Sequence, residues 1–303
     1  MTTSIDVLTT NLTTDLTTDL ATDFATHFDA DLTDDVADNL AEAAVPALDR
    51  SASSTLGNAE ANRVRDQFVD LINKMVPSIV FDPIVHIQSG AHVGDEALAR
   101  FPGSATPAEW FRSAHALGVG DDLELRVLGE VIGRLDQRSG FVGVNVSPQV
   151  LVDPRCVDLL RASQGAELVV ELTDQTAAPR LPVLRARFDE IRDLGIRVAV
   201  HVSEFGLATT QTVMLAQPDV VKLDPDLTAA VATGRAMSTV ADNFFTYCRH
   251  EGVFVVAVGV ERREQLAVLR DRGVDATQGR IYSTADSSDH PALVESQRIG
   301  KLR

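Results

Sequence analysis

The sequence predicts an α/β fold, a (β/α)8 TIM-like barrel whose first two strands form an antiparallel pair, preceded by an acidic low-complexity segment. From residue 78 onward, eight short runs read as strands, most of them rich in valine, alternate in most cases with amphipathic segments. Strands that are apolar on both faces and separated by helical crossovers are typical of a parallel sheet covered by helices. A chain of 303 residues with 45% hydrophobic content can also bury a large core. We therefore expect one folded domain and one tail.

The N-terminal segment has its own pattern. We expect residues 1–60 to form a tail, residues 61–288 the barrel domain, and residues 289–303 a C-terminal extension. Between Leu8 and Leu40 an apolar residue recurs every four positions. Because an α-helix has 3.6 residues per turn, the apolar stripe of such a helix would rotate by about 40° at each step. Two readings stay open: a disordered low-complexity tail, or a conditional amphipathic helix that docks on a partner. The apolar positions are Leu8, Leu12, Leu16, Leu20, Phe24, Phe28, Leu32, Val36 and Leu40.

Charge and composition exclude several classes of protein. Residues 1–60 carry twelve acidic side chains against Arg50 alone, and the rest of the chain is nearly balanced. No basic face stands out, so we expect no polymeric nucleic acid partner. No apolar run reaches the roughly 18 residues of a membrane span and no secretory signal is seen, so we expect a cytoplasmic protein without membrane binding. Cys156 and Cys248 have no metal spacing and are expected to be buried thiols.

The elements of the barrel follow in order along the chain. Residues 61–76 have the apolar spacing of a helix that leads into the domain. Only "QSGA" joins the first two strands, which is too short for a crossover helix, so we expect them to pair as an antiparallel hairpin. The expected strands lie at residues 78–87, 92–101, 141–148, 166–174, 197–205, 219–224, 254–261 and 275–283.

Polar residues gather at the carboxyl ends of these strands, where a barrel of this kind places its chemistry. Unpaired carboxylates that converge on one rim repel each other, and a cation relieves that repulsion. This predicts a cation-binding rim. The residues concerned are Glu96, Asn145, Glu171, Ser203 with Glu204, Lys222 with Asp224, Glu261 and Gln278.

The order of the strand-end motifs resembles the EAL domain family, whose typical members are phosphodiesterases that linearise cyclic di-GMP. "DPIVHIQSGAHVGDEALARF" is similar to the family's first strand and its Glu-Ala-Leu motif, and "FVGVNVSPQVLVDP" to its Asn-x-Ser strand. "VVELTD", "VVKLD" and "DATQGRIYS" resemble its Glu-x-Thr-Glu, Lys-x-Asp and Gln-Gly strands. The resemblance covers about residues 78–284 and implies an EAL-type barrel.

The resemblance also implies roles for individual residues. Glu96, Asn145 and Glu171 would ligate Mg²⁺ or Mn²⁺ through oxygen atoms, together with Glu204. Arg100 would contact a ligand phosphate, in a ligand-binding set that also includes Leu98, Asp82, Asp224 and Gln278. Lys222 and Glu261 would carry catalytic roles, with Lys222 neutralising charge near the attacking water.

The chain departs from the family at the residues on which hydrolysis depends. Ser203 stands where the family has a metal-bridging aspartate, and Val258 stands where it has the general-base glutamate. The segment "LATTQTV" replaces the family loop that follows, Asp174 shortens a glutamate, and Asp82 replaces a glutamine. Loss of a general base alone costs about 10² to 10⁴ in rate. We therefore expect one weak metal site and negligible hydrolysis.

These features favour a catalytically degenerate EAL domain that acts as a cyclic di-GMP receptor or as an adaptor for a protein partner, with a homodimer through the region of the fifth and sixth strands as one arrangement. The alternative is an active phosphodiesterase that produces linear pGpG, in which Glu204 takes the bridging position and Asp174 or Glu261 acts as the base. A third reading has an inert barrel and leaves recognition to the acidic repeat.

Overall fold

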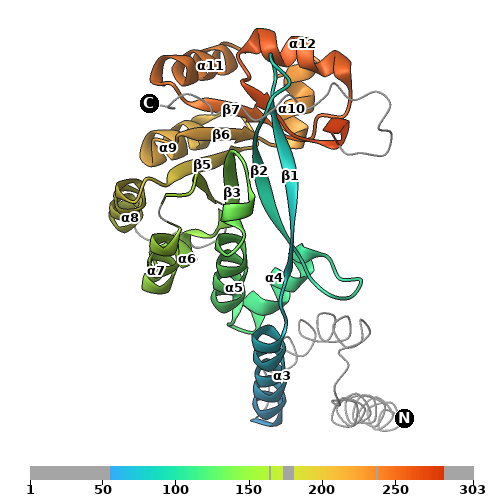
Figure 1. The fold of residues 1–303 in the computed structure, drawn as a ribbon, viewed down its shortest axis with the longest axis vertical. Coiled ribbons are helices and arrows are strands. Elements are labelled where there is room, and N and C mark those ends of the chain that lie inside the picture. Colours follow the sequence, from blue (N-terminus) through green and yellow to red (C-terminus); the bar gives the residue numbers. More distant parts are fainter. Residues whose placement is uncertain (1–54, 164, 173–180, 237, 283–303) are drawn as a thin grey trace, which may run out of the picture.

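Eight strands close into a barrel in chain order, as the sequence predicts (Figure 1). The computed structural model describes residues 55–163, 165–172, 181–236 and 238–282. β1 runs antiparallel to both β2 and β8, and all other neighbouring strands are parallel, so the expected hairpin is confirmed. The strands are β1 (Ser78–His86), β2 (His92–Arg100), β3 (Phe141–Val146), β4 (Leu168–Leu172), β5 (Arg197–Val202), β6 (Val220–Leu223), β7 (Phe254–Ala257) and β8 (Ala276–Thr277).

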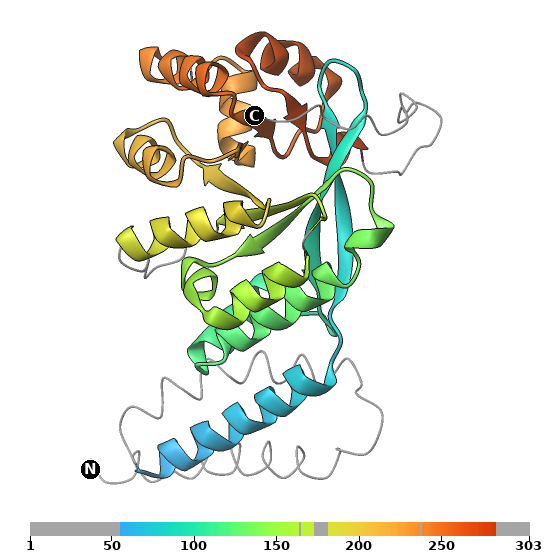
Figure 2. The same cartoon turned by 60° about the vertical axis from the view of Figure 1, so that its left-hand side comes forward.

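Helices connect the parallel strands around the outside of the barrel. The α3 helix leads into β1 and lies beyond α4 and α5, at the end of the molecule opposite α11 and α12 (Figure 2). The helices are α3 (Thr55–Lys74), α4 (Pro107–Ala116), α5 (Gly120–Ile132), α6 (Pro148–Val152), α7 (Pro154–Ala162), α8 (Leu181–Asp193), α9 (Leu207–Ala216), α10 (Pro225–Ala232), α11 (Thr239–Glu251) and α12 (Arg263–Arg272), with 3-10 turns η1 (Leu135–Gln137) and η2 (Arg280–Tyr282).

Local sequence signals explain where several helices begin. Thr106 accepts a hydrogen bond from the Glu109 amide while the Glu109 side chain bonds back, which is a capping box before α4. Ser147 and Asp224 cap α6 and α10 by accepting a hydrogen bond from a backbone amide of the first turn, and each is followed by a proline. The strand-end motifs therefore start helices as well as line the barrel rim.

Three apolar clusters hold the domain together. The largest lies between the strands and the surrounding helices, and includes Val144, Val170 and Val200. A second fills the barrel interior, where Phe141 and Val256 point inward. Because side chains alternate along each strand, these two clusters occupy opposite faces of the same sheet. The third joins α3 to α4 and α5, and consists of Phe68, Leu71, Ile72, Met75, Trp110, Ala114, Leu117, Val119 and Leu123.

Several predicted elements differ in extent from those in the structure: α3 begins at Thr55 rather than at residue 61, and β5 and β7 end at Val202 and Ala257 rather than at residues 205 and 261. The last predicted strand is much shorter, since β8 spans only Ala276–Thr277 and the chain then forms η2. Gly279 has φ +148° and lies so close to the Val260 backbone that a Cβ atom would approach Val260 N to 2.4 Å, so the chain turns away there. The segment after Gly206, expected as a loop, forms the start of α9.

Some predictions fall outside the described residues: the apolar repeat, Asp174 and the C-terminal extension. Within the described residues, no helix is both long enough and apolar enough to cross a bilayer. Cys156 and Cys248 are buried as expected, and burial raises the pKa of each thiol to about 12.

Candidate functional site

The upper layer of the barrel interior is polar. In register along the sheet, Asp82 lies opposite Glu96, and Asn145 lies opposite Glu171. These positions face inward because they alternate with the valines of the outer core, and they lie above the apolar interior cluster. The barrel therefore brings together residues that are as much as 196 positions apart in sequence.

Lys222 lies at the centre of this layer, with only 1% of its surface exposed. Its Nζ donates to Glu96 Oε2 at 2.6 Å and to Glu171 Oε2 at 2.8 Å, with Glu171 Oε1 at 3.1 Å. One ammonium group thus joins two buried carboxylates from β2 and β4. We call Asp82, Glu96, Asn145, Glu171, Lys222 and Gln278, with His201 described below, the polar cluster.

Two amide side chains also donate hydrogen bonds to the Glu96 carboxylate. Asn145 Nδ2 donates to Glu96 Oε1 at 2.9 Å, and Gln278 Nε2 donates to Glu96 Oε2 at 2.8 Å. The same Gln278 nitrogen lies 2.7 Å from Asp82 Oδ2. Gln278 Oε1 is buried without a hydrogen-bond partner, so this amide retains one unused acceptor.

The electrostatics of the polar cluster favour its charged form. Burial opposes ionisation of Glu96, but the Lys222 charge and the hydrogen bonds from Lys222, Gln278 and Asn145 outweigh it and lower the Glu96 pKa to about 2. Burial likewise opposes the charge on Lys222, and the charges of Glu171 and Glu96 outweigh it and raise the lysine pKa. Two carboxylates and one ammonium leave excess negative charge, to which Asp82 adds.

His201 also lies at the site, although it was not among the residues predicted for it. His201 Nε2 lies 3.1 Å from Glu171 Oε2, and its side chain is 34% exposed. A period-two count along β5 could have found it, because Ala199 and His201 share the inward face. The histidine covers the Glu171 carboxylate on the side that faces solvent.

Gly143 makes room for the Glu171 carboxylate. A Cβ atom on Gly143 would lie 2.1 Å from Glu171 Oε1, so the carboxylate would have to move from its present position. The glycine between Val142 and Val144 is therefore part of how this barrel accommodates a buried carboxylate.

A second group of predicted residues lies on the rim and does not join the polar cluster. Arg100 is exposed at the end of β2, four residues beyond Glu96, and donates to its neighbouring Ala99 carbonyl. Ser203 and Glu204 are exposed in the turn after β5. In the part of the chain that the structure describes, neither side chain makes a hydrogen bond to the polar cluster.

The remaining predicted residues have structural partners. Asp224 caps α10 by accepting from the Leu227 amide at 2.9 Å. Glu261 is exposed and forms an ion pair with Arg280. Val258 is half-buried against the apolar interior cluster, and Leu98 is half-buried on β2. None of these four bonds to Lys222.

The polar cluster includes side chains with the oxygen chemistry of a divalent-cation site. Glu96, Glu171 and Asn145 offer oxygen atoms on adjacent strands, which is what Mg²⁺ and Mn²⁺ prefer. Among the described residues, no group of three or more His, Cys, Asp and Glu side chains is arranged to hold a metal ion. Because Ser203 and Glu204 make no bond to the polar cluster, nothing observed there would complete a second position.

Comparison with known proteins identifies the fold and the family. A sequence profile of the EAL domain matches residues 64–285. Cyclic di-GMP phosphodiesterase PdeL of Escherichia coli is 25% identical over 66% of this chain and 60% of its own length. The RNase E specificity factor CsrD of the same organism is 21% identical over 78% of this chain and 38% of its own length. The chain thus spans less than two thirds of these relatives.

Solved structures of low sequence identity share the fold. The Xanthomonas citri FimX EAL domain, in complex with cyclic di-GMP, superposes with a TM-score of 0.64 at 17% identity, over 74% of this chain and 94% of that one. Klebsiella pneumoniae BlrP1, in a complex with manganese and cyclic di-GMP, gives a TM-score of 0.57 at 23% identity, over 69% of this chain and 55% of that one.

Proposed function

The chain belongs to the EAL domain family, and we propose that it acts in cyclic di-GMP signalling without hydrolysing the nucleotide, either as a receptor for it or as an adaptor for a protein partner or a second copy. The proposed boundaries are an acidic tail at residues 1–60, the barrel at 61–288 and a C-terminal extension at 289–303. Relatives and neighbours named for cyclic di-GMP support the signalling role. CsrD, which is named as a specificity factor, supports a non-hydrolytic one.

The observation that carries this proposal is the environment of Val258. Family resemblance assigns this position to the general base, and here it is an apolar side chain packed on the barrel interior. Valine can neither accept a proton nor orient a water molecule. Ser203, at the position assigned to the bridging aspartate, is a neutral and exposed hydroxyl. Metal-assisted hydrolysis needs positioned cations and a base, and both are compromised together.

We assign the remaining site residues by their placement. Glu96, Asn145 and Glu171 would hold one Mg²⁺ or Mn²⁺ weakly, since the Lys222 ammonium already bonds to both carboxylates and would compete with the cation. When bound, that cation would supply positive charge toward a ligand phosphate. Arg100 extends from the exposed end of β2 and would bind a phosphate through its guanidinium group.

One observation favours the second candidate, an active phosphodiesterase. Four residues that the resemblance assigns to metal binding and charge neutralisation do converge in the polar cluster. In that case Glu204 would move toward the polar cluster and a carboxylate such as Glu261 would act as the base. Glu261 is instead paired with Arg280, which is why we favour the non-hydrolytic role.

A calorimetric titration of the full chain with cyclic di-GMP tests the proposal. It is performed in Mn²⁺, in Mg²⁺ and in chelator, and the mixture is then analysed for linear pGpG. Micromolar or tighter binding without product supports the receptor form. Absence of both binding and product supports the adaptor form. Continuous heat with accumulation of pGpG would overturn the proposal and establish the phosphodiesterase.

A further inference from the structure

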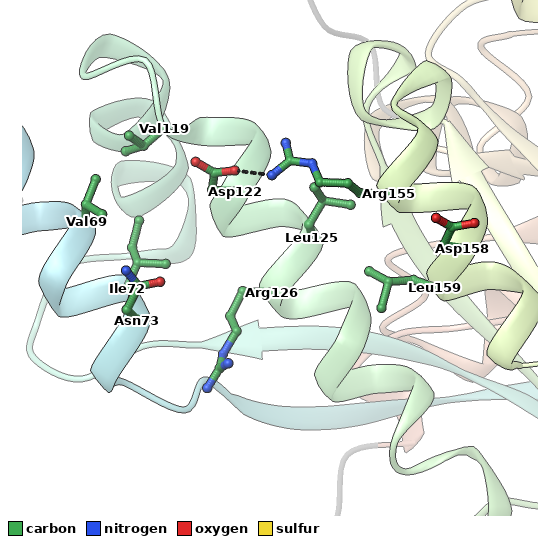
Figure 3. A pocket seen from close by; sticks show the side chains of 10 residues that line it. All are labelled: Val69, Ile72, Asn73, Val119, Asp122, Leu125, Arg126, Arg155, Asp158 and Leu159. Carbon is green, nitrogen blue, oxygen red and sulfur yellow. Dashed lines mark hydrogen bonds and ion pairs between the residues drawn. The ribbon is translucent and has the colours of Figure 1, made fainter.

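A groove lies outside the barrel, between α3, α5 and α7. Its floor is α5, and its sides are α3 and α7 (Figure 3). The groove has a volume of about 710 Å³. Apolar side chains from all three helices line it, including Val69, Ile72, Leu125 and Leu159. A groove between two helices, with an apolar floor, is a shape that receives the apolar face of another helix.

Two guanidinium groups border this groove, and they differ in how they are bonded. Arg155 is fully engaged, with Asp122 at 2.7 Å and Asp153 at 2.8 Å. Arg126 is not, because its Nη2 lies 3.4 Å from the Met75 carbonyl and 4.0 Å from Glu130.

Arg126 therefore offers a weakly paired charge in the groove, whose two carboxylates, Asp122 and Asp158, are already paired with Arg155 and Arg161. Its Nε is buried without any hydrogen-bond partner. Glu130, the nearest carboxylate, makes its short bond to Arg134 instead, at 2.7 Å. The Arg126 side chain as a whole is 38% exposed, so a carboxylate from a docked segment can reach the terminal nitrogens of its guanidinium group.

The apolar repeat of the tail has the matching chemistry. Leu16, Leu20 and Phe24 are each preceded by an aspartate, so a helix would carry an apolar stripe and an acidic row about 100° away from it. Three consecutive apolar residues of the repeat drift by about 80°, which stays within one helix face.

We propose that residues 16–28 of the same chain dock in the groove between α3, α5 and α7 as a helix, with Leu20, Phe24 and Phe28 on the apolar floor and Asp19 or Asp23 at Arg126. The aromatic pair would provide the anchoring contacts, as aromatic side chains do at most interfaces.

Chain connectivity permits this arrangement. The repeat ends at Leu40, and the next fourteen residues before Thr55 can span up to about 45 Å when extended. The distance along α3 from Thr55 to Ile72 is about 26 Å. Because the repeat is tethered to a helix that forms one wall of the groove, its effective concentration there is in the millimolar range.

Hydrogen exchange on the full chain, followed by mass spectrometry, tests the proposal. Peptides within residues 12–36 should exchange at least about tenfold more slowly than in an Arg126→Glu variant, which places a repelling charge beside the aspartates. Arg112→Glu, on the exposed face of α4 and outside the groove, is the matched control and should leave the protection intact. Equal exchange in the wild type and Arg126→Glu would overturn the proposal.

Two further variants separate docking from damage to the fold. Phe24→Asp alters only the tail, and should increase exchange both in the repeat and in the α3 peptide that contains Val69 and Ile72. Asp19→Lys with Asp23→Lys should restore protection to Arg126→Glu, because the charges are exchanged. Failure of this rescue contradicts the pairing. Protection that rises with protein concentration would instead place the repeat of a second copy in the groove.

Discussion

The polar cluster and the rim carry equally recognisable motifs but differ in how their side chains are bonded. In the polar cluster, every carboxylate oxygen of Glu96 and Glu171 accepts a hydrogen bond or ion pair from a buried or half-buried neighbour. On the rim, Arg100, Ser203 and Glu204 are exposed and make no bond to that cluster. The interior side chains are needed for the stability of the fold. The exposed rim side chains are not, so only a function would require them.

This difference explains how the interior residues of a catalytic motif can be retained in a protein that does not catalyse the reaction. Replacing Lys222 or Glu96 leaves a buried charge without its partner, which costs stability whether or not the protein is an enzyme. Replacing an exposed rim residue costs almost nothing in stability. Retained interior residues are therefore weak evidence for catalysis, and the rim decides the question.

The largest expected effect is on the interior. Lys222→Met should lower the free energy of unfolding by about 3 to 5 kcal/mol, because two buried carboxylates lose the ammonium between them. Urea denaturation measures this, with the exposed Lys74→Met as the control. A loss as small as that of Lys74→Met would show that the polar cluster is hydrated, and would remove the contrast with the rim.

Acid should weaken the same region. The Glu96 pKa is lowered from 4.5 to about 2, so its contribution to stability is complete above about pH 4.5 and is lost as the pH falls through about 2. The shift corresponds to stabilisation on the order of 3 kcal/mol. Denaturation between pH 5 and 2 should therefore show a slope that Glu96→Gln reduces, and an unchanged slope in that variant would assign it to other carboxylates.

Introducing the two missing carboxylates should increase the hydrolysis of cyclic di-GMP. Ser203→Asp with Val258→Glu should raise the formation of pGpG in Mn²⁺ by about 10² or more, which chromatography of the product measures. Ser203→Asn with Val258→Gln matches the change in size without the charge and should give no gain. A wild-type rate similar to that of the double variant would favour the active phosphodiesterase.

Substitution of a rim residue should weaken ligand binding while leaving the stability of the fold unchanged. Arg100→Ala should weaken cyclic di-GMP binding at least about tenfold, the usual effect of losing a charge-assisted hydrogen bond. Titration calorimetry compares it with Arg112→Ala on α4. Unfolding curves should be unchanged, and equal affinities of the two variants would exclude Arg100 from the ligand site.

The smallest effect is expected at Glu261. This residue pairs with Arg280 while both side chains are largely exposed, so Glu261→Ala should change stability by less than about 1 kcal/mol. Thermal denaturation in low and high salt measures the change. Loss of nucleotide binding in this variant would instead show that Glu261 belongs to the ligand site.

Much of the fold could be predicted because its signals are local. Val-rich runs separated by amphipathic segments indicated the eight strands, and "QSGA" indicated the antiparallel pair. The last strand was overextended, since the close approach of Gly279 to Val260 depends on two distant segments. Likewise, a period-two count along β5 places His201 on the inward face, but its contact with Glu171, thirty residues away, depends on the neighbouring strand.

The sequence by itself determined the barrel, the order of the motifs and the identities of Ser203 and Val258, because strand period, turn chemistry and residue type are properties of the chain. The tertiary structure decided which strand-end residues share one network and which face solvent. Closing the barrel gives Lys222 two carboxylate partners from β2 and β4, and leaves Arg126 beside an apolar groove. Burial and pairing are set by neighbours that are distant in sequence, which is why no local pattern could assign them.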